Sequence, residues 1–152
     1  MNPARQVWLK AWLLCGTLAA LYATIINLVR GFSPVGVWLG VASGPFGDGA
    51  RQWGLPGVLA GLAVHFAVMA VMAAVGLWLA RNTPLGEVAP WKAGTLYGLV
   101  LYCVMYGLVL SQRFGAPFPN PDRVILALGL FPHIFLVGWP MFTLFRRMPQ
   151  LS

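Results

Sequence analysis

Two histidines are present in the chain, and each lies in a long uncharged run with a glycine four residues before it. Gly61 precedes His65, and Gly129 precedes His133. Positions i and i+4 share a face of a helix, so each glycine opens space beside its imidazole. An ionisable side chain inside a membrane is costly and by default indicates a functional site. If the two runs cross a membrane, these residues are the candidate ligand-binding residues of the chain.

The histidine pair has more than one chemical interpretation. Histidines on facing helices of a four-helix bundle are a known setting for b-type haem, so His65 and His133 could both ligate haem iron while Gly61 and Gly129 make room for the macrocycle. The same residues could instead form interhelical hydrogen bonds or line a pocket for a ligand other than haem, and we favour this interpretation. A zinc site is disfavoured, because two histidines without a nearby carboxylate underfill its coordination shell.

His65 needs a partner from outside the side chains of its own helix. Between Leu55 and Ala80 it is the only strongly polar side chain. An unpaired imidazole in apolar surroundings costs on the order of 1–3 kcal/mol. The partner must therefore come from another helix, the backbone or a ligand. The candidate side chains are Thr17, Thr24, Asn27, Thr95, Tyr97, Tyr102, Tyr106 and His133.

Pro132 immediately precedes the second histidine. Proline has no N–H, so the backbone carbonyl of Leu128, four residues earlier, loses its helical partner. We therefore expect a freed carbonyl at Leu128 and a kink in this helix beside His133.

The composition places these residues in a membrane. The chain has 152 residues, of which 59% are hydrophobic and 9% charged, and its mean hydropathy is +0.77. A soluble domain carries about 25% charged residues, and a globule of this size exposes too much surface to hide so many apolar side chains. The net charge is +7, but the basic residues fall at the edges of apolar runs. That placement is typical of membrane proteins and disfavours nucleic-acid binding.

The uncharged runs predict an all-α integral membrane protein with four transmembrane helices. Each run supplies about 20 residues, enough to cross a hydrocarbon core about 30 Å thick, and runs of this length form helices rather than barrel strands. The predicted spans are residues 7–29, 55–80, 91–112 and 124–145. Between the first two spans, Ser33 and Pro34 predict the N-cap and first position of a short helix over 34–43. It is too short to cross, and we expect it at the membrane interface.

The two halves of the chain repeat the same order of motifs. Gly16-Thr17-Leu18 and Gly61-Leu62-x-x-His65 occur in the first half, and Gly94-Thr95-Leu96 and Gly129-Leu130-x-x-His133 in the second. This order predicts a single membrane domain, 1–152, made of a two-helix tandem repeat over 7–80 and 91–147. Two spans per unit give a pseudo-two-fold axis along the membrane normal. That axis would set the two histidines at equal depth near the middle of the bilayer, facing each other across the bundle.

The distribution of basic residues predicts the orientation. One side of the membrane carries six Lys and Arg residues and the other carries four. The first set is Arg5, Lys10, Arg81, Lys92, Arg146 and Arg147, and the second is Arg30, Arg51, Arg113 and Arg123. The side with more positive charge is expected to be cytoplasmic, so both termini are predicted in the cytoplasm.

The sequence offers little for enzymatic catalysis. Its acidic residues are Asp48, Glu87 and Asp122, all expected in loops, so no relay of buried carboxylates can form. The chain has no Gly-x-Ser-x-Gly or His-Glu-x-x-His motif, and the glycine-rich stretch 44–57 lacks the Lys-Ser/Thr of a phosphate-binding loop. We therefore expect a non-enzymatic accessory subunit or a small-ligand-binding bundle. A haem b electron carrier and a small transporter are the alternatives.

A further set of residues carries a family resemblance. It consists of Gly16-Thr17-Leu18, Ser33-Pro34, the two Gly-Leu-x-x-His motifs and Val137-Gly138-Trp139-Pro140. In this pattern the chain resembles the YagU-like proteins, small multi-span proteins of the bacterial inner membrane without an established biochemical activity. The resemblance implies that location and supplies no catalytic residues. The chain departs from the family in carrying Ala19 where an acidic residue often follows Gly-Thr-Leu. The partners we expect are the lipid bilayer and either a larger membrane complex or a second copy of the chain.

Overall fold

The four predicted membrane spans are present. The computed structural model describes residues 2–147, which contain helices and no strand. By length and composition, four helical segments can cross a membrane. They are Pro3–Val29, Leu55–Asn82, Pro90–Phe114 and Arg123–Arg146. The chain is therefore an all-α, multi-pass membrane protein.

Two of the spans are continuous α-helices and two are interrupted. Helices α1 (Pro3–Val29) and α3 (Leu55–Asn82) form the first two spans. The third consists of α4 (Pro90–Tyr102), the π-helical segment η3 (Cys103–Leu110) and α5 (Ser111–Phe114). The fourth consists of α6 (Arg123–Phe131), the π-helical segment η4 (Pro132–Gly138) and α7 (Trp139–Arg146). Short 3₁₀ turns, η1 (Asp48–Gln52) and η2 (Pro84–Gly86), flank α3.

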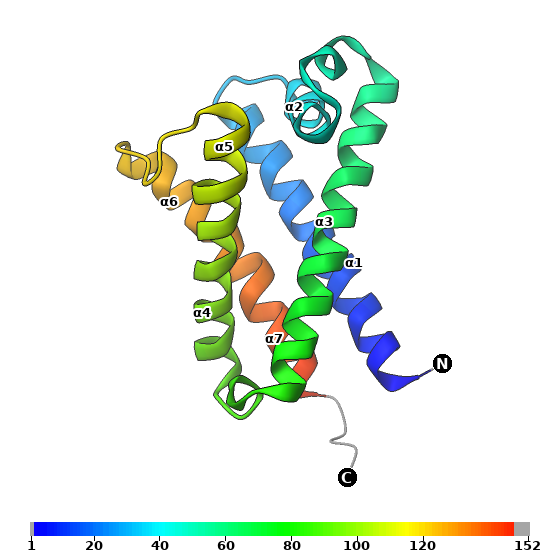
Figure 1. Ribbon diagram of the computed structural model, residues 1–152, viewed down its shortest axis with the longest axis vertical. Coiled ribbons are helices and arrows are strands. Elements are labelled where there is room, and N and C mark those ends of the chain that lie inside the picture. Colours follow the sequence, from blue (N-terminus) through cyan, green and yellow to red (C-terminus); the bar gives the residue numbers. More distant parts are fainter. Residues whose placement is uncertain (1, 148–152) are drawn as a thin grey trace.

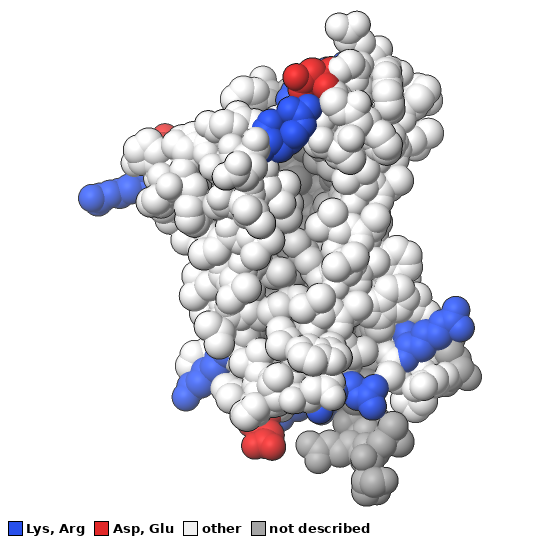
Figure 2. Space-filling model, viewed as in Figure 1, with Lys and Arg blue, Asp and Glu red and all other residues white. Residues whose placement is uncertain are grey.

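The spans alternate in direction (Figure 1). The start of α1, the turn η2 and the end of α7 lie at one end of the bundle, which we call the terminal end. Helix α2 (Pro34–Phe46) and the loop between α5 and α6 lie at the opposite end, which we call the α2 end. Figure 2 shows that charged side chains gather near these two ends and leave an uncharged band between them, as expected for a bilayer-spanning protein.

The short helix predicted between the first two spans is present and longer than expected. Helix α2 starts as predicted, with Ser33 as N-cap and Pro34 in the first turn. It continues to Phe46 rather than ending at residue 43, and Gly47 ends it with φ +83°, which favours glycine. In its last turn, the carbonyls of Ser43 and Gly44 accept hydrogen bonds of 2.8 and 3.0 Å from the guanidinium of Arg113. In Figure 1 α2 is seen end-on, so it lies crosswise to α1 and α3.

Consecutive helices do not all pack on one another. Helix α3 packs on α1, α2 and α7, whereas α4 packs on α6, η4 and α7. Helices α3 and α4 follow each other in sequence and are joined by a hydrogen bond of 2.6 Å from the Tyr97 hydroxyl to the carbonyl of Met72, but they diverge toward the α2 end (Figure 1). The fourth span packs on both α3 and α4, and α1 packs on α3 and on the fourth span.

Glycines bring the third and fourth spans into backbone contact. A Cβ atom placed at Gly94 would lie 2.5 Å from the carbonyl oxygen of Gly138, and one at Gly98 would lie 2.5 Å from that of His133. Gly94 and Gly98 form a Gly-x-x-x-Gly pattern, which lets membrane helices approach closely where no hydrophobic effect drives them together.

The proline in the fourth span has the consequence predicted for it. Segment η4 starts at Pro132, so the α-helical hydrogen-bond pattern changes there. The carbonyl of Leu128 accepts a hydrogen bond of 2.9 Å from the hydroxyl of Tyr22 on α1. A donor from another helix thus satisfies the carbonyl that proline leaves free, as apolar surroundings require.

Substitution of a single glycine tests the backbone contact. We expect Gly94→Ala to lower the free energy of unfolding by about 1–3 kcal/mol, because the added methyl group meets backbone that cannot move away cheaply. Gly44→Ala is the matched control, since nothing lies within 4 Å of a Cβ at Gly44. Thermal unfolding in detergent measures both variants. Equal melting temperatures for the two variants would contradict the packing described.

Candidate functional site

Each histidine lies in its own aromatic cluster. The first cluster comprises Trp38, His65 and Phe66, from α2 and α3, and we call it the Trp38 cluster. The second comprises Tyr102, Tyr106 and His133, from the third and fourth spans, and we call it the tyrosine cluster. No hydrogen bond or ring contact between the residues described joins His65 to His133.

His65 is held by a backbone carbonyl of the first span. Its Nε2 lies 2.9 Å from the carbonyl oxygen of Gly16. A carbonyl only accepts, so Nε2 donates, and in a neutral imidazole Nδ1 then keeps an unshared lone pair. The rings of Trp38 and Phe66 stand edge-on to the imidazole, with centroids 5.5 and 5.3 Å away. The partner of His65 is thus none of the side chains considered from the sequence but the backbone of α1.

Gly61 lets α2 approach α3. A Cβ at this position would overlap the backbone carbonyl of Trp38. The space that this glycine opens is therefore filled by α2, and it is needed to bring the Trp38 ring against His65.

His133 is held by its own helix. Its Nδ1 lies 2.7 Å from the carbonyl oxygen of Gly129, so Nδ1 donates and Nε2 keeps the lone pair of a neutral ring. The rings of Tyr102 and Tyr106 stack at 4.6 Å and stand edge-on to the imidazole at 5.9 and 5.8 Å. The two histidines therefore present opposite ring nitrogens: Nδ1 is left as an acceptor in His65 and Nε2 in His133.

Gly129 makes room for the two tyrosines. A Cβ there would lie 2.8 Å from Cζ of Tyr106 and 3.0 Å from Cε2 of Tyr102. The glycine four residues before His133 thus does open space on that face of the helix, and aromatic side chains from the third span occupy it.

One polar atom of the tyrosine cluster has no partner. Tyr102 is 5% exposed, and its hydroxyl is the buried side-chain polar atom that has no hydrogen bond among the residues described. By contrast, Tyr97, five residues earlier and equally buried, donates to the carbonyl of Met72 at 2.6 Å. A buried donor without a partner costs about 1–3 kcal/mol, so the Tyr102 hydroxyl is a group that could donate a hydrogen bond to a ligand.

The tyrosine cluster lies where both irregular spans depart from α-helical geometry. Tyr106 belongs to η3 and His133 to η4. Single π-helical turns are frequent at functional sites, because the changed turn re-aims side chains. Sequence reasoning pointed to Pro132 beside η4, but nothing in residues 103–110 predicted η3.

The geometry does not favour haem between the two histidines. The Nε2 atom of His65 is bonded to Gly16, and the spaces beside Gly61 and Gly129 are filled by α2 and by tyrosine rings. A haem macrocycle bound to both histidines would have to displace α2 from Gly61 and the tyrosine rings from Gly129. Haem ligation thus stays a prediction that needs its own test.

Absorption spectroscopy supplies that test. We expect protein purified from cells supplied with haem precursor to show no Soret band, since no space for the macrocycle is left beside either glycine. A Soret band that is lost in both His65→Ala and His133→Ala would contradict the packing assigned to the two glycines.

Comparison with known proteins gives a partial relative. No family model matches the chain, and no solved structure matches it. Over 83 residues the chain is 30% identical to the glucose-6-phosphate exchanger SLC37A2 of Xenopus laevis. The match covers 55% of this chain and 17% of that protein, so the chain spans a small part of its relative's length.

A matched pair of tyrosine variants tests the unpartnered hydroxyl. We expect Tyr102→Phe to leave the free energy of unfolding unchanged or to raise it by about 1 kcal/mol, because it removes a buried donor without a partner. Tyr97→Phe should lower it by about 1 kcal/mol, because it removes a hydrogen bond. Thermal unfolding of both variants in detergent makes the comparison. A loss of stability in Tyr102→Phe as large as that in Tyr97→Phe would mean that the Tyr102 hydroxyl is bonded within the protein.

Proposed function

We propose that the protein binds a small polar solute at the tyrosine cluster and carries it across the membrane. The observation that carries this proposal is the buried, unpartnered hydroxyl of Tyr102 beside His133. The Tyr102 hydroxyl offers a donor and Nε2 of His133 offers an acceptor lone pair. A solute hydroxyl both donates and accepts, so it can satisfy the two groups together. The faces of aromatic rings such as Tyr106 suit the apolar face of a sugar ring.

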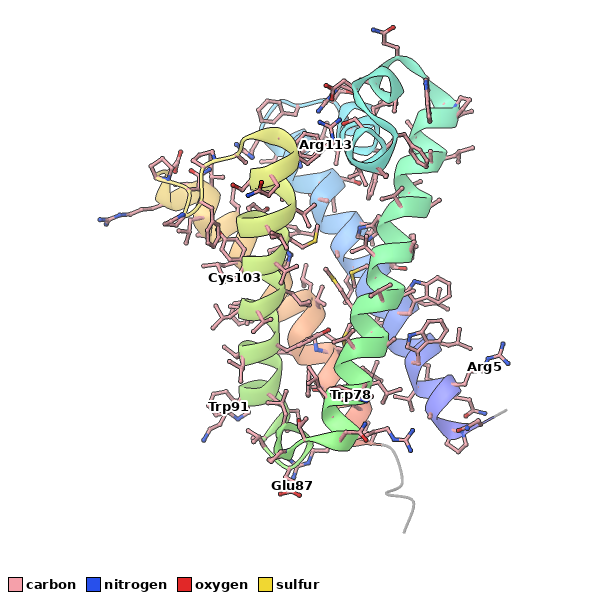
Figure 3. The ribbon with its side chains drawn as sticks, in the orientation of Figure 1. Arg5, Trp78, Glu87, Trp91, Cys103 and Arg113 are labelled. Carbon is pink, nitrogen blue, oxygen red and sulfur yellow. The ribbon has the colours of Figure 1, made fainter. Side chains whose placement is uncertain are left out.

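A hollow in the surface favours transport over binding alone. Helices α3 and α4 diverge toward the α2 end, and Figure 2 shows the surface hollowed between them, below the paired charged side chains of that end. Arg113 spans this opening: it forms an ion pair of 2.9 Å with Asp48 and holds the end of α2 (Figure 3). A contact of this kind can open without disturbing the packed terminal end.

The partial relative points in the same direction. SLC37A2 is named as an exchanger of glucose 6-phosphate, and a sugar phosphate carries the hydroxyls that the Tyr102 and His133 pair would recognise. We therefore keep the ligand-binding bundle and the transporter from the sequence analysis, in preference to an accessory subunit or a haem carrier. On the charge distribution and the family resemblance, we propose a bacterial inner membrane as its location, with both termini in the cytoplasm.

Uptake into proteoliposomes tests the proposal. Vesicles that contain the protein should accumulate labelled glucose 6-phosphate faster than protein-free vesicles. Tyr102→Phe should weaken the apparent affinity about fivefold, the effect of one lost hydrogen bond of about 1 kcal/mol. Tyr97→Phe is the matched control and should retain the wild-type affinity per folded protein.

Solute binding gives a second readout that does not depend on choosing the right labelled substrate. A bound solute raises the melting temperature of the folded protein. Among a panel of sugars and sugar phosphates, at least one should stabilise the wild type and not Tyr102→Phe. The proposal is wrong if no solute in the panel stabilises the protein, or if stabilisation is the same in Tyr102→Phe and Tyr97→Phe.

A further inference from the structure

A second candidate site lies at the terminal end of the bundle, on helices that do not contribute to the tyrosine cluster. The start of α1 and the end of α3 line an open cavity of about 390 Å³. Arg5 and Trp8 line it from α1, and Trp78 and Arg81 line it from α3. Figure 3 labels Arg5 and Trp78 on these two helices, toward the terminal end.

The two helices contribute the same pair of residue types in mirrored order. On α1 the arginine comes three residues before the tryptophan, and on α3 it comes three residues after. Residues three apart share a helix face, and α1 and α3 run in opposite directions. Both arginines therefore lie nearer the end of the bundle and both tryptophans nearer its middle. The Trp8 indole is fixed in place by a hydrogen bond of 3.0 Å to the carbonyl of Ala70.

Among residues 2–147, no carboxylate balances the positive charge of this cavity. Neither Arg5 nor Arg81 forms an ion pair with a carboxylate among residues 2–147, where the one ion pair joins Arg113 to Asp48. No acidic residue lines the cavity. The side-chain amide nitrogen of Asn82, which also lines it, donates a hydrogen bond to the carbonyl of Trp78. Two guanidinium groups above an apolar floor of Trp8 and Leu77 fit an anion that carries an apolar tail.

An exposed apolar ridge continues from the cavity toward the middle of the membrane. Val71, Val75 and Trp78 are 63%, 46% and 60% exposed. They are spaced by four and three residues along α3, so they form one ridge on one face of the helix. A lipid whose headgroup lies between the arginines can lay an acyl chain along this ridge. A soluble anion has no acyl chain, so the ridge would contribute nothing to its binding.

We propose that this cavity binds an anionic phospholipid. The phosphate lies between Arg5 and Arg81, the glycerol region lies against Trp8 and Trp78, and one acyl chain follows the ridge formed by Val71 and Val75. Basic pockets between membrane helices are a known means of holding anionic headgroups, and tryptophan is enriched at that depth of the bilayer.

Quenching of tryptophan fluorescence by brominated lipid tests the proposal. The full-length protein is reconstituted in vesicles of brominated phosphatidylglycerol or brominated phosphatidylcholine, each mixed with unbrominated phosphatidylcholine. Bromine quenches nearby indoles, and Trp8 and Trp78 line the cavity. We expect the wild type to prefer phosphatidylglycerol on the order of tenfold, as two arginines near an anionic headgroup allow. The Arg5→Gln/Arg81→Gln variant should lower this preference to about threefold or less.

The control removes the same charge from the same end of the bundle. Lys10→Gln/Lys92→Gln takes away two positive charges outside the cavity and should keep the preference of the wild type. Glycerol 3-phosphate, which has the headgroup chemistry without acyl chains, should not displace the brominated lipid. Helix content by circular dichroism must match in all variants.

Three results would each overturn the assignment. The first is equal quenching of the wild type by both lipids. The second is an equal loss of preference in the control variant, which would indicate general attraction to the charged end rather than a site. The third is displacement by glycerol 3-phosphate, which would indicate a site for a soluble phosphate.

Discussion

A polar group inside a bilayer has no water to bind, so it must find its partner within the protein. In this chain the solution recurs: a side-chain donor on one helix bonds to a backbone carbonyl on another. Tyr22 bonds to Leu128, His65 to Gly16, and Tyr97 to Met72. Such bonds tie the spans together where hydrophobic burial does not act between them, and glycines bring the backbones close enough for them to form. The buried hydroxyl of Tyr102, which has no such partner among residues 2–147, is an exception to this pattern, and its ring lies beside His133.

Much of the fold could be predicted from the sequence. The length of each apolar run and the charges at its ends are properties of one segment alone and do not depend on how the helices pack. The ends of the spans were predicted less well: α1 begins at Pro3, capped by Asn2, because a helix extends past the apolar core that the membrane requires. The freed carbonyl of Leu128 was also predictable, since a proline acts on its own helix four residues away. The tandem repeat, the facing arrangement of the histidines and the orientation in the membrane stay predictions.

The candidate site was predicted less completely, because it depends on how helices cross. The sequence singled out His133 and Gly129, but it did not show that tyrosine rings fill the space beside the glycine. It left another helix, the backbone or a ligand open as the partner of His65 and named only side chains as candidates, and the partner is the backbone carbonyl of Gly16. A backbone carbonyl has no signature in sequence, so its availability to another helix appears only in three dimensions. The same holds for the Tyr102 hydroxyl. It has no partner because the neighbouring helices, in the part of the chain that the structure describes, place no hydrogen-bonding group within its reach, and this cannot be seen in the sequence.

Nitrogen-15 solid-state NMR of the protein in bilayers, labelled on histidine and free of any histidine tag, tests the account most directly. The sequence has two histidines, so two pairs of ring signals are expected. The account predicts one ring protonated on Nε2, which is His65, and one protonated on Nδ1, which is His133. A solute that binds should shift the Nε2 signal of His133 and leave His65 unchanged. Two rings of the same tautomer, or a bound solute that leaves His133 unmoved, would contradict it.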